Sequence, residues 1–274
     1  MSINADGYRT RELNALLLGH VRAGARRLRV GGLTGQRYLG TNLSGFDHLL
    51  RLELYGTPGN DLGAFLDGPE IEVMGNAQDG VGNTMNRGRI IVHGHAGDIL
   101  AMSARGGEIF VRGNIGYRGC LHMKEYEGHG PLVVIGGTAQ DFFGEYMAGG
   151  TAVLLGLGHY PNPTRAGHHF RGDAGDGQSR GGVVLVHRIL YLATGMHGGR
   201  IYIRGEFDRR GLAPQVEVVP VSDLSTEPIL KQAIQQFSTI FEGSLTDRDR
   251  ELLAGGPYYR LQPRGTRPYG KMYA

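Results

Sequence analysis

Carboxylates and carboxamides recur at one position of this chain and are the first candidates for acid–base chemistry. Asn60, Asp79, Asp98 and Asp141 each lie four residues after a glycine of a repeated phrase. A positioned Asp can act as a general acid or base. Short Asx side chains also bond to nearby backbone in turns, and so regular a recurrence favours that structural role.

Histidine and cysteine give the next candidates. His93 and His95 alternate and could chelate a metal from one face of a strand, but no third ligand recurs at matching register. Cys120 and His122 have the same spacing and would also share a face, without a third group to orient a nucleophile–base pair. His168–His169 falls in an inserted loop, where a solvated pair is expected. These patterns do not predict a catalytic or metal site.

Two glycine-rich stretches have the look of phosphate loops. They begin at Gly113 and Gly172 and carry glycines at intervals of two or three residues. Neither has the strand-then-long-helix context in which such a loop binds phosphate. The sequence has no Gly-x-Ser-x-Gly, so it gives no support to a nucleophile-elbow esterase. We therefore predict no catalytic, cofactor-binding or metal-binding residue in this chain.

A second set of polar and aromatic residues decorates the repeats without serving the needs of a turn. Corners need glycine and Asx, but they do not need Gln, Glu and Tyr together, which favours a surface that meets another protein. The four tyrosines of the last segment suggest an arm that lies on a partner or on the body of the chain. The predicted interface residues are Gln78, Asp79, Glu125, Tyr126, Gln140, Asp141, Glu145, Tyr146, Tyr258, Tyr259 and Tyr269.

The elements that position these residues come from a phrase with a 19-residue period. The glycines Gly56, Gly75, Gly94 and Gly113 recur at this period, and apolar residues stand two and four positions before each of them. Because alternate residues of a strand point to the same face, each phrase predicts a short strand with two apolar side chains on one side. A period of this length is typical of a solenoid, whose repeats bury their apolar sides by stacking.

The register survives two interruptions. The step from Gly113 to Gly137 is lengthened by an insertion around residues 125–130, and a larger displacement falls between Tyr160 and Gly181. Counting from Leu28 to about Leu212 gives about nine repeats.

A 19-residue repeat is too short for helical repeats, which need over about 30, and the leucine pattern of leucine-rich repeats is missing. The sequence therefore predicts an all-β fold: a single-stranded, right-handed parallel β-helix of about nine 19-residue rungs with capping helices at both ends. We expect one internal stack with a spacing of about 4.8 Å. Its members are Val73, Val92, Val111, Ile135 and Leu154.

The two ends of the chain are different material. Apolar spacing predicts a helix over residues 8–24, a second over 228–242 and a shorter one after Thr246. A helix at each end would cover the open edge and the apolar core of a terminal rung. The predicted organisation is a capping helix in 1–27, the β-helix in 28–212 with an insertion at 160–181, and helices with an extended arm in 213–274.

Composition limits the class of function. The 48 glycines follow no G-X-Y triplet, so collagen is excluded, and Cys120 is the single cysteine, which excludes a disulfide framework. The net charge is only +3 and the arginines are scattered, which argues against nucleic acid as the partner. Neither a leader nor an apolar run long enough to span a bilayer is apparent. We expect a cytoplasmic chain with no membrane contact.

Long phrases of the chain lie at residues 10–14, 56–65, 75–86, 122–126, 136–150 and 267–271. These phrases resemble the GXGXG domain family, the C-terminal β-helix domain of the glutamate synthase large subunit. The chain looks most like its free-standing form, the domain 3 subunit of archaeal-type and N-methylglutamate synthase-like enzymes. One subunit family of formylmethanofuran dehydrogenase, with its formyltransferase/hydrolase relative, shares that fold and is the nearer rival.

The resemblance implies a non-catalytic scaffold in a glutamate synthase-type oxidoreductase of glutamate biosynthesis and nitrogen metabolism. Its implied partners are a class II glutamine amidotransferase subunit and an FMN-binding glutamate synthase subunit. FMN and an iron–sulfur cluster would be held by the partner, and no cofactor by this chain. A component of a formylmethanofuran dehydrogenase or formyltransferase/hydrolase complex is the alternative, and a stand-alone binding module is a second one. The sequence leaves open which complex it is.

Overall fold

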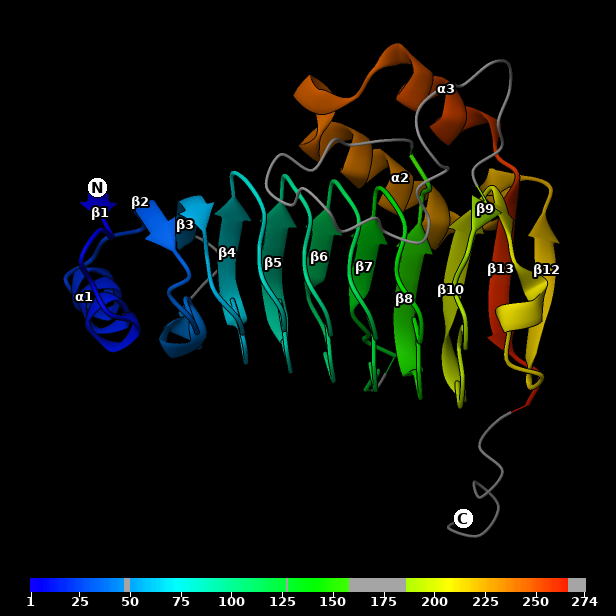
Figure 1. Ribbon diagram of the computed structural model, residues 1–274, viewed down its shortest axis with the longest axis horizontal. Helices are drawn as coiled ribbons and strands as arrows, with labels where there is room; N and C mark the ends of the chain where they lie inside the picture. Colours follow the sequence, from blue (N-terminus) through cyan, green and yellow to red (C-terminus); the bar gives the residue numbers. More distant parts are fainter. Residues whose placement is uncertain (47–49, 127, 158–185, 266–274) are drawn as a thin grey trace, which may run out of the picture.

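The computed structural model describes residues 1–46, 50–126, 128–157 and 186–265. Within these ranges, eleven strands form one sheet that runs along the molecule in the order β1-β2-β3-β4-β5-β6-β7-β8-β10-β13-β12 (Figure 1). Its strands are β1 (Ser2–Asn4), β2 (Arg27–Thr34), β3 (Arg51–Thr57), β4 (Asp67–Val73), β5 (Arg87–Val92), β6 (Glu108–Val111), β7 (Leu132–Ile135), β8 (Ala148–Leu154), β10 (Gly198–Arg204), β12 (Val216–Val221) and β13 (Tyr258–Pro263). β9 (Val186–His187) and β11 (Glu206–Phe207) pair separately.

The 19-residue register is confirmed by the strand pairing. Leu54 pairs with Val73, Val73 with Val92 and Val92 with Val111, each partner lying one repeat further along the chain. The same column continues through the longer step to Ile135 and then to Leu154. Repeats therefore stack in parallel from β2 to β8.

The predicted internal stack is also confirmed. Its five members, from Val73 to Leu154, are all fully buried, and the residues two positions earlier in each strand are buried beside them. They belong to one apolar core that extends from β2 to β13. The alternating apolar residues of each phrase therefore fill the inner face of the sheet, as strand geometry requires.

The predicted fold class is wrong. Instead of a parallel β-helix of about nine rungs, the described residues form one sheet of mixed direction that is not closed on itself. β13 pairs antiparallel with both β10 and β12. Each repeat supplies one strand to this sheet, and most of the rest of the repeat is turn.

The reason lies in the backbone between the strands. Arg118, Cys120 and His122 all have positive φ values, of 57°, 61° and 54°. The equivalent residues of the neighbouring repeats share this left-handed conformation. An extended strand needs negative φ, so a segment with alternate left-handed residues cannot form a second strand. Its N–H groups bond across repeats instead, as from Arg118 to Asp141 O at 3.0 Å.

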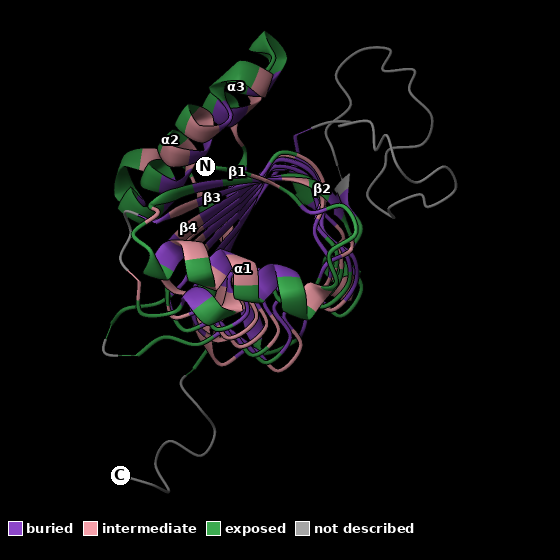
Figure 2. Ribbon diagram, turned by 90° about the vertical axis from the view of Figure 1, so that its left-hand side faces the viewer, coloured by how far each residue is buried: buried purple, intermediate pink, exposed green. Residues whose placement is uncertain are grey.

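α1 (Thr10–Arg22) covers one end of the sheet, as predicted. Figure 1 shows it beside β1 and β2, and Figure 2 looks onto it from that end. Leu13, Leu17 and Val21 of α1 are buried in the main core. They lie three or four positions apart and so share one face of the helix.

The helices predicted for the C-terminal part form, but they do not cap the other end. α2 (Pro228–Ile240) and α3 (Asp247–Gly255) lie along the outer face of the sheet (Figure 1). Leu230, Ala233 and Phe237 of α2 form a second core with outward-facing side chains such as Phe110 and Val134. Those strands present apolar residues on both faces, which is why a helix covers the outer one.

The other end is closed by the antiparallel pair of β12 and β13. Residues 258–263, predicted as part of an extended arm, are strand β13, and residues 266–274 lie outside the described residues. The insertion at 160–181 also lies outside them. The remaining short elements are η1 (Thr41–Leu43), η2 (Arg209–Gly211), η3 (Leu224–Thr226) and η4 (Glu242–Ser244).

Candidate functional site

The recurrent Asx residues form a ladder that bonds one repeat to the next. Oδ1 of Asp79 accepts from the backbone N–H of Asp98 at 2.9 Å, and Oδ1 of Asp98 accepts from that of Tyr117 at 2.8 Å. A Cβ on Gly97 would lie 2.0 Å from Asp79 Oδ1, so glycine at this position leaves room for the Asp79 carboxylate. These oxygens therefore satisfy turn backbone, which is the role that the sequence favoured.

A second ladder runs beside the first. Oδ1 of Asn76 accepts from His95 N at 2.8 Å, and Nδ1 of His95 accepts from Asn114 N at 2.9 Å. Oδ1 of Asn114 accepts from Thr138 N at 2.9 Å, and the Thr138 hydroxyl lies 2.7 Å from Nδ1 of His187. A ring nitrogen that accepts an N–H carries no proton, so Nδ1 of His95 is the unprotonated nitrogen.

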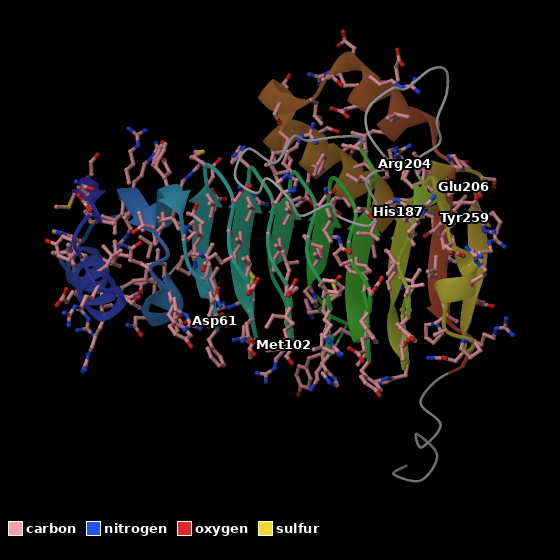
Figure 3. All side chains as sticks on the ribbon, viewed as in Figure 1. Asp61, Met102, His187, Arg204, Glu206 and Tyr259 are labelled. Atoms are coloured by element: carbon pink, nitrogen blue, oxygen red, sulfur yellow. The ribbon has the colours of Figure 1, made fainter. Side chains whose placement is uncertain are left out.

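His187 and Arg204 are buried together where this ladder ends (Figure 3). Nε2 of His187 donates to the carbonyl of Arg204 at 3.0 Å, so Nδ1 accepts from Thr138. Burial lowers the pKa of His187 to about 4. Arg204 donates to the carbonyls of Leu155 and Gly156. The pair thus joins several backbone segments, which is a structural role.

His93 does not share a site with His95. Nε2 of His93 lies 2.8 Å from Glu72 Oε1, and its ring meets the edge of Phe241 on the outer face of the sheet. The hydrogen bond from His93, with that from Arg51, holds the pKa of Glu72 at about 2 against the effect of burial. No group of three His, Cys, Asp or Glu side chains in the described ranges could hold a metal ion.

Cys120 and His122 do not face the same side, contrary to the prediction. The Cys120 side chain is fully buried, and burial raises the pKa of its thiol. The His122 side chain is exposed and stacks on Tyr146 with ring centroids 5.3 Å apart. The prediction assumed a strand, but both residues lie in a left-handed turn, where positions two apart need not share a face.

The predicted interface residues divide by exposure. Gln78, Glu125, Tyr126 and Tyr146 are exposed; Asp79 and Tyr259 are partly exposed; Gln140, Asp141, Glu145 and Tyr258 are buried; Tyr269 lies outside the described residues.

Three of the buried members, Asp141, Glu145 and Tyr258, have side-chain partners within the chain, and so does Tyr259. Asp141 Oδ1 accepts from Leu190 N at 3.0 Å, and Glu145 forms an ion pair with Arg118. The Tyr258 hydroxyl donates to Leu253 O at 2.8 Å. Tyr259 donates to Glu206 at 3.0 Å, and Figure 3 shows the two side by side.

The structure brings together a set of side chains that sequence reasoning missed. The Phe142 and Tyr191 rings stack at 4.6 Å, and the Arg118 guanidinium lies 4.5 Å from the centroid of Phe142. The three residues occupy one register position of successive repeats, and this was the signal that could have found them. We call the set the aromatic cluster; it consists of Tyr117, Arg118, His122, Phe142, Tyr146, Leu190 and Tyr191.

The aromatic cluster is open to solvent. Tyr191 is 56% exposed, Tyr146 46%, Tyr117 45% and Leu190 41%. Aromatic residues and arginine are the side chains that most often anchor protein–protein interfaces.

Among the described residues, every helix is too short or too polar to span a bilayer.

Comparison with known proteins supports one family. The model of the GXGXG motif family matches residues 24–249. A protein of Methanocaldococcus jannaschii named Uncharacterized protein MJ1350 is 38% identical over 273 residues, covering 99% of this chain and 95% of that protein.

A solved structure shows a related fold at low identity. It is the formyltransferase/hydrolase complex FhcABCD from Methylorubrum extorquens in complex with methylofuran. One of its chains aligns with a TM-score of 0.54 and 16% identity, over 86% of this chain and 73% of that chain. The family match and the archaeal relative show that the chain belongs to the GXGXG motif family.

Proposed function

We propose that this chain is a non-catalytic structural subunit of a multisubunit enzyme complex of the formyltransferase/hydrolase type. The observation that carries the structural role is the engagement of its candidate catalytic groups. Asp79, Asp98 and His95 accept backbone hydrogen bonds from the next repeat, and Cys120 is fully buried. A general base must present a lone pair to a proton of the substrate, and each of these groups either gives one to the backbone of the next repeat or lies in the core, which supports a structural role.

The type of complex is supported by the solved structure with a related fold. That structure is a complex of several different subunits, and the alignment covers most of both chains. At 16% identity the likeness is one of fold, so the partner subunits and any one-carbon substrate belong to the proposal.

A glutamate synthase-type complex is the second candidate, and the chain's own phrases favour it. The run Gly56–Phe65, the stretch Gly75–Asn86 and the run His122–Tyr126 resemble the β-helix domain of glutamate synthases. Here the partners are a class II glutamine amidotransferase and an FMN-binding synthase. FMN and an iron–sulfur cluster would lie on the synthase, and this subunit would hold neither.

One experiment tests both candidates. The full chain, tagged at its N-terminus, is purified from its own cells, and the co-purifying subunits are identified by mass spectrometry. A formyltransferase and an amidohydrolase support the first candidate; an amidotransferase and a flavin-containing synthase support the second. A chain that purifies alone at stoichiometric yield contradicts both and leaves a stand-alone binding module.

A further inference from the structure

We propose that the aromatic cluster is the surface by which this chain docks onto an uncharged, apolar surface of a different subunit. The proposal rests on the structural-subunit role proposed above and names the contact surface. It does not depend on which of the two complexes is formed.

Bulky residues of the aromatic cluster have a left-handed backbone conformation. Phe142, Tyr146 and Tyr191 have φ values of 65°, 50° and 57°. For bulky residues this region is strained, and glycine or asparagine would occupy it more readily. At the equivalent positions of other repeats the chain has Gly80 and Gly195. Large rings at these positions therefore do not help the turn to form.

The tyrosine rings of the aromatic cluster are only partly buried. A ring that is half exposed gains only part of the free energy that full burial would give. The rings of Tyr146 and Tyr191 are in this position, as are those of Tyr38 and Phe65 elsewhere on the chain. Tyr146 and Tyr191 in addition stack on the neighbouring rings of His122 and Phe142. Strained residues that persist on a rigid frame cluster at functional sites.

Neighbouring side chains hold the rings of the aromatic cluster in place. Phe142 is held between Tyr191, whose ring stacks on it at 4.6 Å, and Arg118, whose guanidinium lies over it at 4.5 Å. His122 stacks on Tyr146. Side chains that are already fixed lose little conformational entropy when a partner binds, so they give more of their interaction energy to affinity.

The charge of the cluster selects the partner. Arg118, which carries the permanent charge of the cluster, forms an ion pair with the buried Glu145. The carboxylates of Asp98 and Asp141 accept from the N–H groups of Tyr117 and Leu190, so the charged groups beside the rings are already engaged within the chain. The excess of carboxylates disfavours an anionic partner such as nucleic acid. An apolar, uncharged protein surface is the complementary occupant.

Site-specific photo-crosslinking in the intact complex tests the proposal. The crosslinking amino acid p-benzoylphenylalanine replaces Tyr146 or Tyr191 in the tagged full chain. Tyr38 and Phe65 are matched controls, because they are 44% and 54% exposed, have positive φ and occupy equivalent turn positions several repeats away. We expect adducts with a different subunit from Tyr146 and Tyr191 and none from the controls.

Three results would overturn the proposal: adducts with a second copy of this chain, equal adducts from Tyr38 and Phe65, or an intact complex in which Tyr146 and Tyr191 give none. These results leave the proposed function standing. Recovery of no complex at all would instead contradict the proposed function, and the docking surface with it.

A pair of substitutions gives an independent measurement. Tyr146→Asn removes the ring and suits the left-handed backbone, so we expect unchanged or higher stability of the isolated chain and at least about tenfold weaker subunit recovery. Phe65→Asn makes the same change at φ 60° outside the aromatic cluster and should leave recovery unchanged. Equal losses in both variants, or no loss in either, would contradict the docking surface.

Discussion

The carboxylate of Asp98 accepts a hydrogen bond from the backbone N–H of Tyr117 at 2.8 Å, one repeat further along the chain. This bond therefore ties adjacent turns as strand pairing ties adjacent strands. Asp79 makes the same bond to the N–H of Asp98. Asp79 and Asp98 are therefore each an acceptor for the following repeat and, through their own N–H groups, a donor to the preceding one.

The first prediction concerns this ladder. Asp98→Ala leaves the Tyr117 N–H without its acceptor, and we expect a loss of about 1 kcal/mol in the free energy of unfolding, the usual net value of such a bond. Asp98→Asn keeps an acceptor oxygen and should cost much less. Urea unfolding followed by circular dichroism measures both. Equal losses in the two variants would show that the charge matters and the acceptor does not.

The second prediction concerns the internal stack. Val111 is fully buried in β6, and Val111→Asp would place an unpaired charge in the apolar core. We expect a loss of at least several kcal/mol, enough to prevent folding or to lower the melting temperature strongly. The control is Tyr55→Asp, on an exposed β3 side chain. A fully stable Val111→Asp protein would contradict the inward direction of this column.

The sequence predicted the strands well because their signal is local. Ile90 and Val92 stand two apart before a glycine, and the structure buries both on the inner face. The 19-residue period then gave the pairing of neighbouring strands without further information. α1 and α2 were predicted from their apolar spacing, and their bounds agree with the expected ranges within a few residues.

The errors arose where backbone conformation depends on neighbouring repeats. Cys120 and His122 look like strand residues in the sequence, but they adopt left-handed φ. This becomes possible because their N–H groups bond to Leu100 O and Glu145 O of adjacent repeats. The pairing of β13 with β10 has no periodic signal either, because the two strands are far apart in the chain. The aromatic cluster was missed since its members meet only after the repeats have stacked.

The third prediction concerns pH. Burial lowers the pKa of His187 to about 4, from an ordinary value of 6.5 in the unfolded chain. The unfolded state therefore takes up a proton first, so stability is full above pH 6.5 and falls as the pH drops toward 4. One unit of pKa is about 1.4 kcal/mol, so the full loss is about 3 kcal/mol.

Between about pH 5 and about pH 7, the effect of His187 protonation on stability can be measured apart from that of the carboxylates. Glu72, whose pKa is about 2, gives a loss of stability only below its unfolded value of 4.5. Unfolding free energies measured across this range should fall with acidity in the native chain and much less in His187→Gln, which keeps a donor and an acceptor. The same slope in both proteins would show that another group is responsible.

The last prediction concerns the exposed edge of the sheet. β12 is the last strand, and the carbonyl of Gln215 accepts from the Arg264 N–H at 2.9 Å, so odd-numbered residues of β12 turn their backbone toward β13. Pro220 therefore stands at a position whose N–H would point outward, and its ring removes that donor from the edge. An edge strand that keeps such donors offers a template on which another chain can pair. Pro220→Val should restore the donor and produce concentration-dependent self-association, measured by light scattering after size-exclusion chromatography.

Pro263→Val, within the paired strand β13, should remain as monodisperse as the native chain. If Pro220→Val is equally monodisperse at high concentration, the proline is not what protects this edge.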